Sequence, residues 1–273
     1  MMIFAYPFTL SALTLCLLLT GILSFFGYHV VRRGVIFVDL ALAQVAALGA
    51  SLGILLGLGE DHPTANFFLS LAFTLLGALL FSWFRGRKKL PIEALIGITY
   101  AAAMAFSLIV LEKSATGSEE LKERLVGSIL TVSPTMLAIA AGLAIGVGAL
   151  LWLARKPLFL ITENESAAQA KGLKLWLWDF LFYTTFGIIV TYSVRVAGVL
   201  LVFAFLIVPS LASILAVGGT WRRIIFGWLF GTVGCTLGLE ASLRLDWSAG
   251  PCIVATFILL LVAVSIFSKF QKA

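Results

Sequence analysis

Charged residues are scarce in this 273-residue chain. They make up 12% of the sequence, whereas a soluble domain has about a quarter, and hydrophobic residues make up 61%. The apolar residues fall in runs of about 20, the length that an α-helix needs to cross a bilayer. No segment between these runs is long enough for a separate soluble domain. We therefore expect a single membrane domain over residues 1–273.

Cysteines and catalytic motifs are also lacking. The three cysteines, Cys16, Cys235 and Cys252, lie in apolar runs, which favours small buried side chains over metal ligands or a disulfide. The sequence has no G-x-x-x-x-G-K-[ST] motif, so the chain does not hydrolyse nucleotide by itself. It has no HExxH, CxxC or nucleophile-elbow pattern either. We predict no enzyme activity, no resident cofactor and, because the basic residues are confined to short loops, no nucleic-acid binding.

The apolar runs predict an all-α protein with eight or nine transmembrane helices. The predicted spans are 8–28, 34–58, 65–84, 92–111, 135–154, 175–192, 196–217, 224–239 and 250–267. The count depends on residues 193–198, which form either an external turn or a break within one helix. The segment LVGSILTVS at 125–133 is too short to span and is expected to be re-entrant or interfacial.

Lysine and arginine residues indicate the orientation in the membrane. Most of the 19 lie in the loops after the first, third, fifth and seventh spans or in the C-terminal tail, and the positive loops of membrane proteins face the cytoplasm. The N-terminus is therefore predicted to be external and the C-terminus cytoplasmic. The residues on the predicted cytoplasmic side are Arg32, Arg33, Arg85, Arg87, Lys88, Lys89, Arg155, Lys156, Lys171, Lys174, Arg222, Arg223, Lys269 and Lys272.

A short polar segment, TENESAAQAKGLK at 162–174, separates two spans on the predicted cytoplasmic side. Thr162 is expected to N-cap a helix, and Glu165 three residues later completes a capping box. Gly172 stands where a left-handed C-terminal cap is expected. A helix of about ten residues is not stable alone, so it must pack against something else.

Four polar residues in the predicted spans are candidates for a transport path. Asp39 is the clearest, because a carboxylate in mid-membrane costs about 2.5–3.5 kcal/mol. Gln44 lies five residues later, about 140° around the helix. Glu93 and Tyr100 share one face of the fourth span. Each carboxylate also has an alternative explanation: Asp39 as an interfacial group paired with Arg32 or Arg33, and Glu93 as a first-turn acid favoured by the helix dipole and the nearby basic residues.

Small residues suggest tight packing of the second span. Gly49, Gly53 and Gly57 repeat every four residues, a spacing that permits close approach of helices. The alternative is that they reflect only the general abundance of glycine in membrane helices.

Several segments, taken in order, resemble the permease subunits of bacterial ABC transporters that import zinc, manganese or iron. They are VVRRGVIFVDLALAQVAALGASLG, IEALIGI, LVGSILTVS, AGVLLVFAFLIVPSLAS and LGLEASLRLDWSAGPCIV, and the resemblance covers about residues 24–267. It implies a homodimeric permease in the bacterial plasma membrane that works with two cytoplasmic ATPase subunits, which bind the ATP. An external substrate-binding protein would deliver the metal ion.

The resemblance also assigns a role to the short polar helix. In this family the equivalent segment is the coupling helix, which docks in a groove of the ATPase. The family pattern Asp-x-x-x-Ala-x-x-x-Gly is matched by Asn164, Ala168 and Gly172, with Asn164 in place of the acid and Glu165 beside it. The resemblance implies that Ala168 and Gly172 form the face that contacts the ATPase.

One departure from the family concerns the metal. Family members often carry an acid and a histidine four residues apart in the second span, both implicated in metal passage. Here Gln44 stands at the histidine position, Asp39 is displaced by one residue from the acid position, and no predicted span contains a histidine. Imidazole suits zinc, whereas carboxylate and amide oxygens suit harder ions such as manganese. The metal therefore stays open, as do two alternatives: a permease for a metal chelate or another small nutrient, and an ion-coupled secondary transporter.

Overall fold

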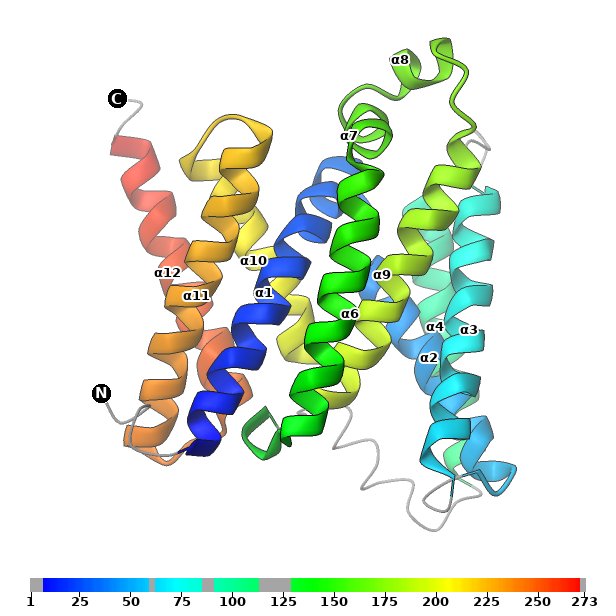
Figure 1. Cartoon of the computed structure of the whole chain (residues 1–273), viewed down its shortest axis with the longest axis horizontal. Helices are drawn as coiled ribbons and strands as arrows, with labels where there is room; N and C mark the ends of the chain where they lie inside the picture. The colour runs from blue at the N-terminus through cyan, green and yellow to red at the C-terminus, as the bar shows by residue number, and fades with distance from the viewer. Residues whose placement is uncertain (1–6, 59–61, 85–90, 113–128, 271–273) are drawn as a thin grey trace. The chain divides into compact units, whose positions relative to one another are not determined.

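The chain is helical throughout the part that the computed structural model describes, which is residues 7–58, 62–84, 91–112 and 129–270. In these ranges nine helices are long and apolar enough to cross a membrane, which confirms the all-α class and the higher of the two predicted counts (Figure 1). The nine are α1 (Pro7–Arg33), α2 (Val38–Leu55), α3 (Pro63–Phe84), α4 (Ile92–Leu111), α6 (Pro134–Leu153), α9 (Leu175–Ala197), α10 (Val199–Ala216), α11 (Thr220–Leu245) and α12 (Ala249–Phe270).

Most helix ends lie within a few residues of the predicted span limits, and α4 has the predicted limits. The largest differences are at helix ends that carry polar residues. α1 continues to Arg33, so His29 lies inside a helix, with its ring 4.7 Å from that of Phe25, and the prediction that no span contains a histidine is wrong. α9 continues to Ala197 before Gly198 separates it from α10. Of LVGSILTVS, residues 125–128 lie outside the described residues, and a 3-10 helix spans Ile129–Thr131.

The chain forms two compact units, each assembled from separate stretches of sequence. Unit 1 comprises Met1–Val31, Glu123–Gly148 and Ser193–Ala273, and unit 2 comprises Arg32–Lys122 and Ala149–Tyr192. Three of the four boundaries between the units fall within α1, α6 and α9, and the fourth, between residues 122 and 123, lies outside the described residues. The single permease domain over residues 1–273 stays a prediction.

In unit 1, α10, α11 and α12 pack against one another. Phe257 of α12 contacts Phe205 of α10 and Phe230 of α11, with ring centroids 5.8 and 6.0 Å apart. α1 joins this core where Gly27 lies against the backbone of Leu206, at a place where a Cβ atom would clash. The three cysteines of the chain all belong to this unit and are buried and free, as predicted.

In unit 2, α2 is the central helix and packs against α3 and α4. A Cβ atom on Gly49 would lie only 2.9 Å from the Cα atom of Ser70 in α3, so the two helices meet at their backbones. This confirms the close packing predicted for the second span. Gly57 has a different role, since it follows the end of α2 and does not lie in a helix contact.

Candidate functional site

The polar segment between α6 and α9 forms two short helices, α7 (Arg155–Glu163) and α8 (Glu165–Ala170), in place of the single helix predicted over 162–174 (Figure 1). α7 begins immediately after α6, and Pro157 is its third residue, a position where no N–H group is needed for the helix. Leu158 and Ile161, three residues apart, are buried on one face. α7 therefore packs on its own chain, and α8 packs on α7.

The N-terminus of α8 is capped by Asn164. Its Oδ1 atom accepts a hydrogen bond from the N–H group of Ala167 at 2.9 Å. The predicted capping box of Thr162 and Glu165 is wrong, because Thr162 lies inside α7 and Glu165 is the first residue of α8. Aspartate and asparagine both offer the side-chain oxygen that an N-cap needs. Replacing the family's acid with Asn164 therefore removes the charge but keeps the cap.

The C-terminus of α8 ends as predicted at Gly172, whose φ is +73°. The N–H group of Gly172 bonds to the carbonyl of Gln169 at 2.9 Å, and that of Leu173 bonds to the carbonyl of Ala168 at 3.1 Å. These two bonds form a Schellman motif, which satisfies the last carbonyls of the helix. α8 thus has both ends closed although it has only six residues.

The outward face of α8 differs from the predicted one. Ala168 is fully buried, so its methyl group packs inside this chain, which corrects the expectation that Ala168 lies on the face toward a partner. The exposed residues of α8 are Glu165, Ser166, Gln169 and Ala170. Their spacing places them on one side of the helix. This exposed side carries small or polar groups.

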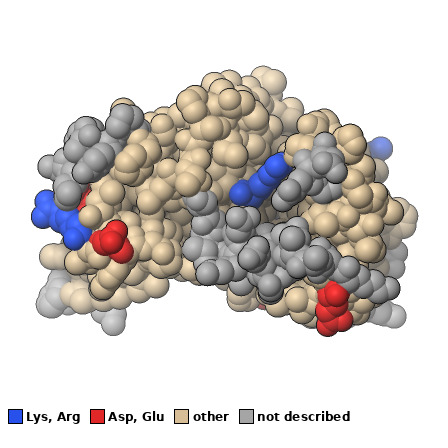
Figure 2. Space-filling model, turned by 90° about the horizontal axis from the view of Figure 1, so that it is seen from below, with Lys and Arg blue, Asp and Glu red and all other residues tan. Residues whose placement is uncertain are grey.

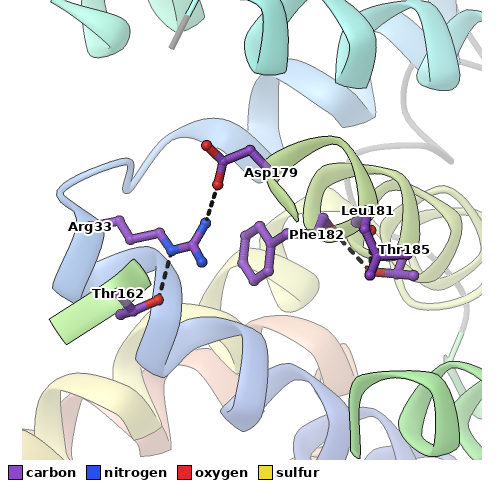
Figure 3. A network of polar contacts seen from close by, with 6 residues as sticks. All are labelled: Arg33, Thr162, Asp179, Leu181, Phe182 and Thr185. Carbon is purple, nitrogen blue, oxygen red and sulfur yellow. Dashed lines mark hydrogen bonds and ion pairs between the residues drawn. The ribbon is translucent and has the colours of Figure 1, made fainter. Parts of the chain in front are cut away.

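A buried charged cluster joins the end of α1, α7 and the beginning of α9 (Figure 3). Arg33 donates a hydrogen bond from Nε to Thr162 Oγ1 at 2.8 Å and one from Nη1 to Asp179 Oδ1 at 2.9 Å. Its Cζ atom lies 4.4 Å from the centre of the Phe182 ring, within cation–π range. The side chains of Arg33 and Asp179 are 2% and 0% exposed. No local sequence pattern indicates this pair, because 146 positions separate its members.

Asp39 is the second residue of α2 and is 2% exposed. The sequence offered Arg32 or Arg33 as an ion-pair partner for Asp39. In the structure Arg33 pairs with Asp179 instead, and the side chain of Arg32 is exposed whereas Asp39 is buried. Within the described ranges, Asp39 Oδ1 has no hydrogen-bond partner. A buried carboxylate oxygen without a partner is destabilising. This unpaired buried oxygen distinguishes Asp39 from the exposed Glu93.

The other path candidates are less enclosed. Gln44 is half-buried on α2, Tyr100 is half-buried on α4, and Glu93, the second residue of α4, is exposed. α2 and α4 pack together. In the chain α3 follows α2 and runs in the opposite direction, so α2 and α4 both start at the same end of unit 2 (Figure 1). Asp39 and Glu93 thus occupy equivalent first-turn positions. The basic loop 85–89, a predicted partner of Glu93, lies outside the described residues.

The four candidates do not form a tight ion site in the described part of the chain. Among the described residues, no hydrogen bond or ion pair joins any two of them, and no group of three histidine, cysteine, aspartate or glutamate side chains could hold a metal ion.

Figure 2 shows charged side chains scattered among the described residues of the face that it presents. In unit 2, Glu112 follows the end of α4, and in unit 1, Arg195 lies in the last turn of α9. In unit 1, Glu240 and Arg244 pair at 2.9 Å near the end of α11. The charged residues in the loop 113–124 lie outside the described residues.

Comparisons with known proteins agree over almost the whole chain. The model of the ABC 3 transport family matches residues 5–268. The manganese import system permease protein ScaB of Streptococcus parasanguinis is 25% identical over 248 residues, which cover 90% of this chain and 86% of that protein. The manganese transport system membrane protein MntC of Halalkalibacterium halodurans is 24% identical over 268 residues, with 98% and 89% covered. The structure of PsaBC from Streptococcus pneumoniae in complex with Fab shares the fold, with a TM-score of 0.80, 23% identity and coverage of 97% of this chain and 96% of that chain.

Proposed function

The chain belongs to the ABC 3 transport family, and on this premise we propose that it is the membrane permease of an ATP-driven importer of divalent metal ions. Two of its relatives are named for manganese. The oxygen atoms of Asp39 and Gln44 suit manganese or iron(II) better than zinc, which favours imidazole and thiolate. We therefore infer manganese or iron(II) as the cargo. An external binding protein would supply the ion and most of the selectivity.

The observation that carries this proposal is the α7–α8 element. The chain lacks a nucleotide-binding motif of its own, yet it presents a six-residue helix that is capped at both ends and supported by a second helix. A helix of this length is only marginally stable in water, so both caps and the underlying α7 contribute to keeping it formed. Its exposed face would dock on a cytoplasmic ATPase. The functional complex would contain two copies of this chain and two ATPase subunits.

The orientation follows from the basic residues near this element. Arg155, Lys156, Lys171 and Lys174 flank α7 and α8, and by the positive-inside rule this end faces the cytoplasm. In a bacterial plasma membrane the N-terminus would then be external and the C-terminus cytoplasmic. Asp39 would lie at the cytoplasmic end of α2, where its carboxylate would attract a cation that is leaving the path.

Transport in proteoliposomes tests the proposal. We expect uptake of radioactive manganese when the chain is reconstituted with its ATPase, the binding protein and ATP, and none when ATP or the ATPase is omitted. Uptake by the chain alone, driven by a proton or sodium gradient, would show a secondary transporter instead. Uptake of a chelated metal without uptake of the free ion would show the chelate permease.

A second experiment tests the docking face. Gln169→Trp places a bulky ring on the exposed side of α8 without altering a buried contact. We expect this variant to lose co-purification with the ATPase and ATP-driven uptake together. Glu112→Trp changes an exposed residue at the opposite end of unit 2 and is the matched control. Equal ATPase association in the two variants would show that α8 is not the docking element.

A further inference from the structure

The buried cluster around Arg33 links α1, α7 and α9, which lie far apart in the sequence (Figure 3). Thr162 belongs to α7, which supports α8, and Asp179 belongs to the first turns of α9. Arg33 is the last residue of α1. One side chain thus bonds to α7 and to α9 at the same time, through 2.8 and 2.9 Å hydrogen bonds.

Adhesion alone does not explain such a cluster. A buried ion pair is a costly way to hold helices together, because both charges lose their water, and apolar side chains of similar volume often stabilise a protein as well or better. What a guanidinium adds is direction, since its N–H groups lie in one plane at fixed angles. Bonds of this kind are lost once the heavy atoms separate beyond about 3.6 Å. The cluster therefore favours a defined placement of α7 relative to α9.

The cluster also lies next to the start of α2. Gly34 follows Arg33 with φ +68°, and the N–H group of Val38 bonds to the carbonyl of Val35 at 3.2 Å, which closes the turn into α2. Asp39 is six residues after Arg33 along this tight connection. A displacement of Arg33 is therefore carried to Asp39 by a short, folded piece of backbone.

We propose that Arg33 is a positioning residue that couples the placement of α7 and α8 to the beginnings of α9 and α2. The inference rests on the proposed function, in which an ATPase moves α8. When α8 moves, α7 moves with it and displaces Arg33 through Thr162. Arg33 in turn displaces Asp179 on α9 and, through the Gly34 turn, Asp39 on α2. The polar end of the path thus responds to the ATPase through residues that lie outside α8.

Thr162→Val tests this coupling with a small change. Valine has nearly the shape of threonine but cannot accept the Arg33 hydrogen bond, and the ion pair to Asp179 is kept. Thr185→Val is the matched control. Thr185 is buried like Thr162 but lies in α9, and its hydroxyl group donates hydrogen bonds to the carbonyl groups of Leu181 and Phe182 in the same helix. The quantity to measure is the number of manganese ions imported per ATP hydrolysed in reconstituted complexes.

We expect Thr162→Val to lower this ratio by about tenfold, with ATPase association unchanged, and Thr185→Val to leave it near the native value. Arg33→Lys keeps a charge for Asp179 but lacks the planar fork, so we expect a similar loss. The double variant of Arg33→Lys with Thr162→Val should be no worse than either single variant, because both remove the same link.

A merely structural role would give a different result. If Thr162→Val or Arg33→Lys lowers the yield and the melting temperature while the surviving complexes keep the native ratio, the proposal is wrong. Additive losses in the double variant would also overturn it. Absence of ATP-driven uptake by the native complex would instead refute the proposed function itself, so the two failures are distinguishable.

Discussion

The N-terminal cap of α8 allows a quantitative test of the coupling element. Asn164→Ala removes the Oδ1 atom that accepts the hydrogen bond from Ala167. Loss of an N-cap side chain costs about 1 kcal/mol, with a range of about 0.5–2 kcal/mol. In a six-residue helix there are too few other bonds to compensate. The equilibrium between folded and frayed α8 should therefore shift about fivefold, and between about twofold and thirtyfold at the limits of that range.

Hydrogen exchange measures this shift directly. In the peptide that covers residues 162–174, we expect the protected amides of the Asn164→Ala protein to exchange about fivefold faster than in the native protein. The apparent affinity for the ATPase should fall by up to the same factor, because a partner that binds only folded α8 must first select that state. Uptake at limiting ATPase concentration should fall accordingly.

Asn164→Asp is the control for this prediction. Aspartate keeps the capping oxygen and adds a negative charge at a helix N-terminus, which is favourable by about 0.3–1 kcal/mol. We expect exchange and uptake at or above the native level. If Asn164→Ala exchanges at the native rate, the cap does not stabilise α8. If Asn164→Asp behaves like Asn164→Ala, the effect has a cause other than capping.

Three further predictions concern the path and the packing of unit 2. Asp39→Asn should reduce the rate of manganese uptake by about tenfold, which corresponds to about 1.4 kcal/mol in activation free energy. Glu93→Gln changes an exposed residue and should have a smaller effect, and equal effects of the two variants would contradict a special role for the buried acid. Gly49→Ala should destabilise the protein by about 1–3 kcal/mol, because its Cβ atom would press on the backbone of α3, while Gly97→Ala enters open space and should leave the melting temperature unchanged or higher. Gly172→Ala should destabilise the folded state of α8 by about 1–2 kcal/mol, because alanine is disfavoured at this left-handed φ. The amide hydrogens of α8 should then exchange faster, and an unchanged exchange rate would show that the cap is dispensable.

Local sequence signals were sufficient for much of the fold. Long apolar runs predict helices because a bilayer leaves a chain few other structures. The limits of α4 follow from Pro91 before it and the polar residues after it. The left-handed Gly172 and the close contact at Gly49 were also predicted, since in both cases the residue type and its immediate neighbours decide the geometry.

Non-local contacts account for what was missed. α7 is not among the predicted helices, and the burial of Leu158 and Ile161 in the folded chain explains why this segment is helical. Thr162 was assigned to the wrong role for a related reason. Its hydroxyl bonds to Arg33, a residue 129 positions earlier, so no nearby residue could reveal it.

The separation of Arg33 from Asp179 also has a consequence for biosynthesis. A ribosome adds about 5–20 residues per second, so the 146 positions between them correspond to about 7–30 s of synthesis. During that interval α9 and its Asp179 carboxylate are not yet made, and in the proposed orientation the charges of Arg32 and Arg33 would retain this end of the first helix in the cytoplasm. In that orientation the same arginine would act first as a topology signal for membrane insertion. It becomes part of the buried cluster only when α9 arrives, so closure of the cluster is a late step in the assembly of unit 2.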